Sequence, residues 1–499
     1  MRESGILMHI TSLPSPYGVG TMGKEAYRFV DFLKKSGQRY WQILPVTPTG
    51  YGDSPYQSCS TFAGNHYLID LDLLVEEGML KKSEITKIKW SETPERVNFG
   101  LLYNHRLDVL RLAFRRFQPT EAFETFCHAN DSWIWDFAMF MALKAKNNGK
   151  PWYQWEAPLK FRDDAALTEI WHREKEEITF HCFLQYLFAL QWEKLRSYAH
   201  DRGVQIIGDV PIYVPLDSAE VWSNPHLFEL DENLTPVAVA GCPPDGFNAD
   251  GQLWGNPLYR WDIHKAEDFR WWVQRMGAAG ERYDMVRLDH FRGFESYWAV
   301  PYGDATARNG KWMPGPAMDF VHAMRTQLPH VRMIAEDLGF MTQEVKNLLK
   351  GSGYPGMKVL LFAFDSREPS DYLPHTYIPH SVCYTGTHDN VTTRQWFDTA
   401  PKAAVRYARE YMHIGAEESD VWGTIRTAMS SVSELCIIPM QDYLELGAEA
   451  RMNFPGTQSG DNWTWRAAKG YSNTALSKRI YRLTELYGRL EIEKEDINR

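Results

Sequence analysis

The chain has 499 residues, of which 44% are apolar and 24% are charged, and this composition is typical of a folded protein. Its net charge is -10 and it has no block of Lys and Arg, which argues against a nucleic-acid partner because phosphate binding requires concentrated positive charge. No apolar run reaches about 18 residues, so we expect no membrane span.

The N-terminal sequence and the cysteines indicate a cellular compartment. MRESGILMHITSLPSPYG lacks a basic stretch followed by an apolar run of signal length, so it resembles the start of a mature protein. The six cysteines are widely spread without a CxxC pair, which is typical of reduced thiols rather than of disulfides or a zinc site. These features predict a cytoplasmic protein.

Eight short apolar segments follow one another along the chain, and their Ile, Val, Leu and Met residues show little alternation. Strands buried on both faces have this pattern, and helical patterns lie between them. After the first segment, Ala26, Phe29, Val30 and Leu33 share one helical face, and Gly37 stands where a helix would end. Eight buried strands joined by helices predict an α/β fold of the (β/α)₈ TIM-barrel class. The predicted strands are residues 5–10, 40–45, 204–209, 283–289, 331–336, 357–362, 381–384 and 435–439.

The connections between these strands are uneven, and we expect long, largely helical insertions around the C-terminal face of the barrel. Roughly 155 residues separate the second and third strands, far more than an ordinary connection has. Residues 71–202 are rich in Glu, Lys, Trp and Leu and are predicted to form a helical insertion subdomain. Residues 1–70 are then the first part of the catalytic barrel and residues 203–499 the remainder. Two further insertions, at about 211–282 and 291–330, belong on the face that carries the site.

Four of the predicted strands end in acidic side chains, which a barrel brings together at one rim. Arg287 and Asp289 are two residues apart and therefore point the same way from one strand. Four acidic ends concentrate negative charge, which is costly unless a substrate or a reaction requires it. We therefore expect a catalytic site rather than a set of structural ion pairs. The acidic ends are Asp209, Asp289, Glu336 and the pair His388–Asp389.

Two carboxyl groups that flank a bond suit glycoside chemistry, because one attacks the anomeric carbon while the other protonates the leaving oxygen. Arg287 favours the charged form of Asp289, as a nucleophile requires. Crowding by neighbouring carboxylates would raise the pKa of Glu336, as an acid requires. Asp389 would stabilise the positive transition state or hold sugar hydroxyls. A Mg²⁺ or Ca²⁺ site is the competing interpretation, and the positive charge of Arg287 disfavours it.

The aromatic content is high, with 19 Trp, 25 Tyr and 25 Phe. Core packing explains most of these residues, but some lie in Gly- and Pro-rich stretches such as GQLWGNPLYRW, and others in NWTWR. Aromatic rings stack on the flat faces of sugar rings, so these stretches favour a carbohydrate ligand. No GxSxG, HExxH, EF-hand or P-loop pattern occurs, so we expect no serine nucleophile, no metal and no cofactor.

Eight motifs lie around these residues, namely HITSLPSPYGVG, YGDSPYQ, FAGNHYLID, GDVPIYV, GQLWGNPLY, RLDHFRG, AEDLG and THDN. They resemble the motifs of the amylomaltases, which are 4-α-glucanotransferases, or disproportionating enzymes, related to the α-amylases. The resemblance covers nearly the whole chain. It implies a (β/α)₈ barrel that acts in the cytoplasm without a cofactor or metal. It implies as substrates maltodextrins, other α-1,4-glucans from starch or glycogen, and glucose. It also implies a retaining double displacement through a covalent glycosyl intermediate.

The resemblance assigns roles to individual residues. Asp289 would be the nucleophile, Glu336 the acid/base and Asp389 the transition-state stabiliser, in agreement with the reading of their local charges. Further residues would bind the substrate at the −1 subsite and its neighbours. These are Asp209, Arg287 and His388 at the −1 subsite, Tyr51, Ser54, Gln252 and Trp254 at neighbouring subsites, and Asn462 as a further candidate.

Two observations limit these assignments. Many family members carry an aromatic residue directly after PPD in the acceptor-side loop, whereas Gly246 stands there in this chain and Phe247 follows. We therefore expect weaker stacking on the acceptor. For Tyr51 and Ser54, the shaping of a Gly-Pro turn is an alternative to a sugar contact.

Two other functions fit the same residues. An α-glucan hydrolase would use the same three carboxyl groups but pass the glycosyl group to water. A glucan-binding protein without catalysis is the second alternative, which the intact carboxylate set disfavours because binding alone needs no nucleophile.

Overall fold

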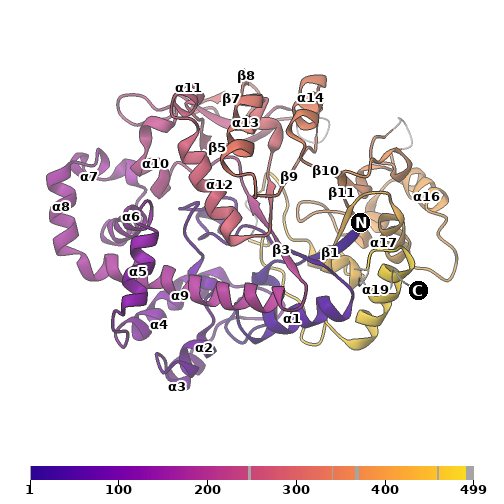
Figure 1. Ribbon diagram of the computed structural model, residues 1–499, viewed down its shortest axis with the longest axis horizontal. Helices are drawn as coiled ribbons and strands as arrows, with labels where there is room; N and C mark the ends of the chain where they lie inside the picture. Colours follow the sequence, from indigo (N-terminus) through magenta and orange to yellow (C-terminus); the bar gives the residue numbers. More distant parts are fainter. Residues whose placement is uncertain (1, 245–248, 340, 366–369, 458–459, 491–499) are drawn as a thin grey trace.

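Eight parallel strands close into a barrel at the centre of the molecule (Figure 1). The computed structural model describes residues 2–244, 249–339, 341–365, 370–457 and 460–490, so Gly246 and Phe247 lie outside the described residues. The order β1-β12-β11-β10-β9-β6-β3-β2 pairs each strand with the next along the chain and the last with the first. The predicted (β/α)₈ barrel and its eight strands are thereby confirmed. The strands are β1 (Glu3–Leu7), β2 (Tyr40–Gln42), β3 (Gln205–Val210), β6 (Met285–Leu288), β9 (Met333–Ala335), β10 (Gly356–Val359), β11 (Ser381–Tyr384) and β12 (Leu435–Pro439).

Barrel strands are buried on both faces because helices cover them outside and side chains fill them inside. Every residue of β6, β9, β11 and β12 is buried. The first covering helix, α1 (Lys24–Lys35), buries the predicted face of Ala26, Phe29, Val30 and Leu33. The chain then turns at Gly37, where φ is 68° and a side chain would be strained.

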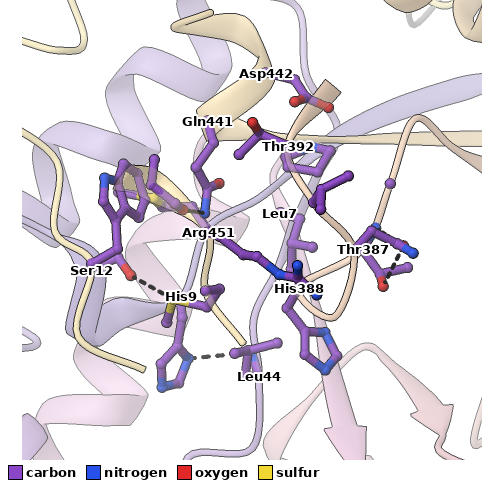
Figure 2. A pocket seen from close by; sticks show the side chains of 18 residues that line it. Leu7, His9, Ser12, Leu44, Thr387, His388, Thr392, Gln441, Asp442 and Arg451 are labelled. Atoms are coloured by element: carbon purple, nitrogen blue, oxygen red, sulfur yellow. Dashed lines mark hydrogen bonds between the residues drawn. The ribbon is translucent and has the colours of Figure 1, made fainter. Parts of the chain in front are cut away.

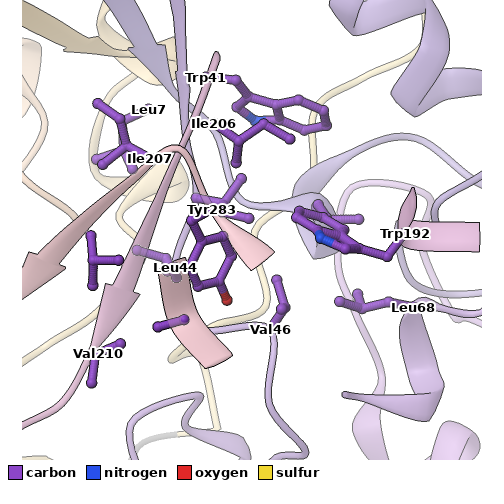
Figure 3. Packing of buried hydrophobic residues seen from close by; sticks show 14 of the residues in the cluster. Leu7, Trp41, Leu44, Val46, Leu68, Trp192, Ile206, Ile207, Val210 and Tyr283 are labelled. Atoms are coloured by element: carbon purple, nitrogen blue, oxygen red, sulfur yellow. The ribbon is translucent and has the colours of Figure 1, made fainter. Parts of the chain in front are cut away.

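The connection from β2 to β3 is helical, as predicted from the sequence. Its last helix, α9 (Lys175–His200), runs from the insertion onto the barrel and packs on α1 and β3. Figure 3 shows Trp192 of α9 in one packed cluster with Leu68, Val46 and Tyr283. One hydrophobic core therefore spans insertion and barrel. The other helices are α2 (Leu71–Glu76), α3 (Lys82–Thr86), α4 (Phe99–Phe114), α5 (Glu121–Ala129), α6 (Ile134–Lys146), α7 (Ala157–Lys160) and α8 (Asp164–Arg173).

The insertions after β3 and β6 share a four-stranded antiparallel sheet that was not predicted from the sequence. Its order is β5-β4-β7-β8, and β4 of the first insertion pairs with β7 of the second. The two insertions are therefore joined by one sheet, which we call the rim sheet. Its strands are β4 (Ala238–Cys242), β5 (Gln252–Pro257), β7 (Ser296–Pro301) and β8 (Lys311–Pro314).

Helices also follow β3 and the later strands. They are α10 (Ala219–Ser223), α11 (Trp261–Ala266), α12 (Arg270–Arg282), α13 (Ala317–Gln327), α14 (Gln343–Ser352), α15 (Thr393–Thr399), α16 (Lys402–Tyr411), α17 (Asp420–Ser430), α18 (Met440–Tyr443) and α19 (Thr474–Leu486). Among the described residues, no helix is both long and apolar enough to cross a membrane.

Candidate active site

Asp289 and Glu336 lie on adjacent strands at the C-terminal rim of the barrel. The register of β6 and β9 places Leu288 opposite Ala335, and the two acidic residues come next on their strands. The main-chain N–H of Glu336 donates to the carbonyl of Leu288 at 3.0 Å, so the pairing continues up to the carboxyl groups. The strand alignment thus brings together the two residues that the sequence singled out.

Arg287 lies inside the barrel and binds two of the acidic residues. Its Nη1 is 2.9 and 2.7 Å from the two carboxylate oxygens of Asp209, and its Nη2 is 2.8 Å from Oδ1 of Asp289. Arg287 and Asp209 are only 3% and 2% exposed, whereas the Asp289 side chain is 27% exposed. Burial raises the pKa of Asp209 to about 6, although Arg287 opposes this shift. Arg287 therefore orients the more open carboxylate of Asp289 and places positive charge beside it.

Glu336 is the buried carboxyl group of the pair, with 8% of its surface exposed. Its Oε2 accepts the main-chain N–H of His290 at 2.7 Å, and its Oε1 accepts that of Leu338 at 2.8 Å. Burial raises the pKa of Glu336 to about 8; Asp289 adds to this rise, while Arg287 and the two N–H groups oppose it. Burial, rather than crowding by carboxylates, is the main cause. Glu336 therefore holds a proton near neutral pH, as a general acid must.

Asp389 lies in the loop that follows β11 and is held by a second segment of the chain. Its Oδ1 accepts a hydrogen bond from Nδ2 of Asn453 at 2.7 Å, and its main-chain carbonyl accepts one from Nη2 of Arg451 at 3.1 Å. The N–H of Asn453 also donates to the carbonyl of His388 at 3.1 Å. The side chain of Asp389 remains 43% exposed, so it is both anchored and accessible. Neither Asn453 nor Arg451 was predicted from the sequence.

Tyr56 joins two of the predicted site residues. Its hydroxyl donates to Oδ2 of Asp209 at 2.8 Å, and its ring is stacked on His388 with centroids 5.1 Å apart. Trp463 lies 5.7 Å from the same ring. Tyr56 belongs to the motif YGDSPYQ, which was singled out, but no local pattern indicates its partners across the barrel.

A cavity of about 30 Å³ lies behind the loop that carries His388 (Figure 2). His9 lines it, and the Nδ1 of His9 accepts the main-chain N–H of Leu44 at 3.3 Å. Burial lowers the pKa of His9 to about 3, so this imidazole is neutral at physiological pH. The cavity has room for water but not for a sugar ring.

The rim sheet brings Gln252 and Trp254 to the same site. Nε1 of Trp254 donates to Oε1 of Gln252 at 3.2 Å. The indole meets the ring of His290 edge-on, with centroids 4.8 Å apart and planes at 85°. Because His290 directly follows Asp289, Trp254 lies beside the strand end that carries Asp289, and Gln252 is hydrogen-bonded to Trp254.

Ser54 and Asn462 contact the backbone of their own loops. Oγ of Ser54 accepts the main-chain N–H of Tyr56 at 3.2 Å, which is the turn-shaping role considered above. Oδ1 of Asn462 accepts the N–H of Phe454 at 3.0 Å, and its Nδ2 donates to the carbonyl of Thr457 at 3.1 Å. Asn462 thus closes a loop beside Asn453.

Tyr51 opens a short 3₁₀ turn, and its side chain lies outside the described part of the structure. Within the described residues, no group of three or more His, Cys, Asp and Glu side chains is arranged to hold a metal ion.

A buried carboxyl group beside an ion-paired carboxylate at the rim of a (β/α)₈ barrel is the arrangement of enzymes that act on glycosidic bonds. The family model described as 4-alpha-glucanotransferase, glycoside hydrolase family 77, matches residues 8–472. The chain therefore belongs to the 4-alpha-glucanotransferase family, whose members transfer glycosyl groups.

The similarity of this chain to individual relatives extends over nearly the full length of both. The chain is 46% identical to the 4-alpha-glucanotransferase of Clostridium butyricum over 97% of this chain and 100% of that protein. It is likewise 46% identical to the 4-alpha-glucanotransferase of Thermus thermophilus over 98% of this chain and 99% of the relative. The structure of an amylomaltase from Streptococcus agalactiae in complex with acarbose matches with a TM-score of 0.96 and 42% identity, covering 98% and 100% of the two chains.

Proposed function

We propose that Asp289, Glu336 and Asp389 carry the 4-α-glucanotransferase reaction as nucleophile, acid/base and transition-state stabiliser. The enzyme would cut an α-1,4-glucan and pass the cut segment to the 4-hydroxyl of glucose or a maltodextrin. The observation that carries this proposal is the contrast between buried Glu336 and the open, Arg287-bound carboxylate of Asp289. The buried environment of Glu336 favours the protonated carboxyl group, and the environment of Asp289 favours the charged carboxylate.

In the first step, Glu336 donates its proton to the glycosidic oxygen while Asp289 attacks the anomeric carbon. The bond between that carbon and the leaving oxygen breaks, and a glycosyl ester forms on Asp289. The new negative charge of Glu336 is not left unpartnered, because the N–H groups of His290 and Leu338 already point at its two oxygens.

In the second step, the 4-hydroxyl of the acceptor attacks the anomeric carbon and displaces Asp289. Glu336 now acts as a base and accepts the proton of that hydroxyl. Asp389 faces the positive charge that develops on the sugar in both steps, and Asn453 keeps one of its oxygens in place. The covalent ester lets the first product leave before the acceptor enters.

The other predicted residues would bind the sugar. We assign Asp209, Arg287 and His388 to the −1 subsite. Arg287 binds both Asp209 and Asp289, and Tyr56 connects Asp209 to the ring of His388. The related Streptococcus agalactiae amylomaltase was solved in complex with acarbose, which supports a glucan-like ligand for this chain. Maltodextrins derived from starch or glycogen would be the donors, in the cytoplasm. Residues of neighbouring subsites would be Tyr51, Ser54, Gln252 and Trp254, with Asn462 supporting the loop beside them.

The substitution Asp289→Asn tests these roles. A neutral amide cannot form the glycosyl ester, so transfer between maltotriose molecules should fall by at least about 10³-fold while circular dichroism stays unchanged. Asp398→Asn is a matched control, because the Asp398 side chain is 66% exposed on α15, and it should transfer normally. Near-normal transfer by folded Asp289→Asn would place the nucleophile elsewhere.

Reducing-end counts separate transfer from hydrolysis. Transfer replaces each broken bond by a new one, so the total number of reducing ends stays constant while glucose and longer chains appear. Hydrolysis adds one reducing end for each bond broken. A steady rise in the number of reducing ends that matches the number of bonds cut would favour the hydrolase alternative.

A further inference from the structure

His290, the residue after the proposed nucleophile, has a backbone conformation that is unusual for a residue with a side chain. Its φ is 51° and its ψ is 48°, in the left-handed region. This turn directs three successive main-chain N–H groups to different acceptors. The N–H of Asp289 donates to Val210 on β3 at 3.0 Å, that of His290 to Oε2 of Glu336 at 2.7 Å, and that of Phe291 to the carbonyl of Glu336 at 3.0 Å. The turn at His290 thus fixes the acid/base carboxyl group.

The imidazole of His290 contacts a second part of the site. It meets Trp254 of the rim sheet edge-on at 4.8 Å, and Tyr213 lies 6.2 Å from the same indole. Loss of hydration lowers the pKa of His290 to about 4, so the contact is made by a neutral ring near neutral pH. Trp254 is only partly buried and keeps surface on which a sugar can stack. One residue therefore connects the proposed sugar platform to the proposed acid/base.

We propose that His290 is a positioning residue that couples a sugar bound at Trp254 to the alignment of Glu336, and thereby favours a sugar over water as the acceptor. The coupling rests on the proposed roles of Glu336 and Trp254. A sugar stacked on Trp254 immobilises the indole and, through the edge contact, the imidazole. The main-chain N–H of His290 then holds Oε2 in line to accept the proton of the sugar hydroxyl.

Water makes no contact of this kind with Trp254. When water enters the site instead of a sugar, the hydrogen bond from the N–H of His290 to Oε2 of Glu336 remains. No sugar then holds the indole and the imidazole, so Glu336 is positioned less rigidly for proton transfer. The glycosyl ester on Asp289 therefore waits for a sugar. The bonds made and broken are those of the proposed second step, with the acceptor hydroxyl replacing the ester oxygen at the anomeric carbon.

The partition of the glycosyl ester between glucose and water measures this coupling. A maltooligosaccharide blocked at its non-reducing 4-hydroxyl cannot itself serve as an acceptor. Initial rates with this donor, with and without saturating glucose, give a transfer-to-hydrolysis ratio that does not depend on the first step. His290→Asn removes the ring but keeps the main-chain N–H, and Asn tolerates the left-handed conformation. The ratio of transfer to hydrolysis should fall about 5-fold or more in this variant.

His413→Asn is a matched control, since His413 is also left-handed, with φ 51°, but lies exposed after α16. Its ratio should equal that of the wild type. His290→Gly, which accepts the same backbone conformation, provides a second variant if His290→Asn fails to fold. Trp254→Ala should lower the ratio in the same direction, and His290→Asn should add little in that background.

Three results would overturn the proposal. A wild-type ratio in folded His290→Asn would show that the ring does not matter. An equal fall of transfer and hydrolysis would show a merely structural role. An unchanged ratio in Trp254→Ala, or additive effects of the two substitutions, would show that the coupling does not pass through Trp254. The proposed catalytic roles are tested separately by the loss of all turnover in Asp289→Asn.

Discussion

The buried carboxyl group of Glu336 makes folding depend on pH. Its pKa rises from 4.5 to about 8 on folding, so the folded chain binds a proton that the unfolded chain has lost between these values. This contribution to stability is therefore fully present below about pH 4.5 and is lost as the pH rises through about 8.

Glu336→Gln should consequently be more stable than the wild type at pH 8, by on the order of a few kcal/mol, and similar to it near pH 4.5. Urea unfolding at pH 4.5, 6 and 8 checks this difference. Glu410→Gln, at an exposed position of α16, should show no such trend. A stability difference that is the same at all three values would contradict the assigned burial effect.

The carboxyl group of Glu336 should also determine the pH at which activity falls on the alkaline side. The first step requires protonated Glu336, so kcat/KM for the donor should fall tenfold per pH unit once the pH exceeds about 8. Initial rates of transfer between pH 5 and 10 measure this limb. A plateau that continues to pH 10 would mean that another group donates the proton.

At the scale of single residues, the acidic residues could be predicted from the sequence, but their hydrogen-bond partners could not. Asp289 and Glu336 were found because each follows a buried apolar strand, and a barrel aligns such positions. Asn453 is 64 residues away from Asp389 in the sequence, and Tyr56 is 153 residues away from Asp209. No local pattern indicates such hydrogen bonds, which depend on the complete fold.

Among the elements, β3 has a position where only glycine fits. A Cβ atom at Gly208 would lie 2.2 Å from the ring of Tyr283, and Gly208 directly precedes Asp209. Gly208→Ala should lower the free energy of unfolding by about 1–3 kcal/mol, because the strand or the ring must shift. It should also reduce transfer by displacing Asp209. Gly415→Ala, where a Cβ would meet no atom within 4 Å, is the control for denaturant unfolding and activity. Equal stability of the two variants would show that β3 adjusts without cost.

The barrel strands could be predicted from the sequence and the rim sheet could not, for a physical reason. Barrel strands are buried on both faces and therefore appear as continuous apolar runs. β5 contains Gly255 and Pro257, and β8 is mostly exposed, so neither shows a strand pattern. The pairing of β4 with β7 also joins segments about 60 residues apart. That residues 71–202 form a subdomain stays a prediction, and the contact of α9 with both parts argues for a shared core.

For the whole molecule, a double displacement predicts retention of the anomeric configuration. Adjacent strands hold Asp289 and Glu336, and we expect their carboxyl groups to be roughly 5–5.5 Å apart, the spacing of retaining enzymes. When water occasionally accepts the glycosyl group, the new reducing end should appear first as the α-anomer. Proton NMR at early times in the reaction distinguishes the anomers before they interconvert. Initial β-anomer would rule out the roles assigned to this pair.

The shared rim sheet also limits how this chain can be recombined with its relatives. Val239 of β4 lies opposite Val300 of β7, so the segments after β3 and β6 are joined by main-chain hydrogen bonds as well as by side chains. A chimera that replaces only one segment would have to reproduce that register with a foreign neighbour, and a slip of one residue would turn Trp254 away from the rim. The two segments therefore behave as a single cassette, and acceptor preference should be inherited only when both are exchanged together.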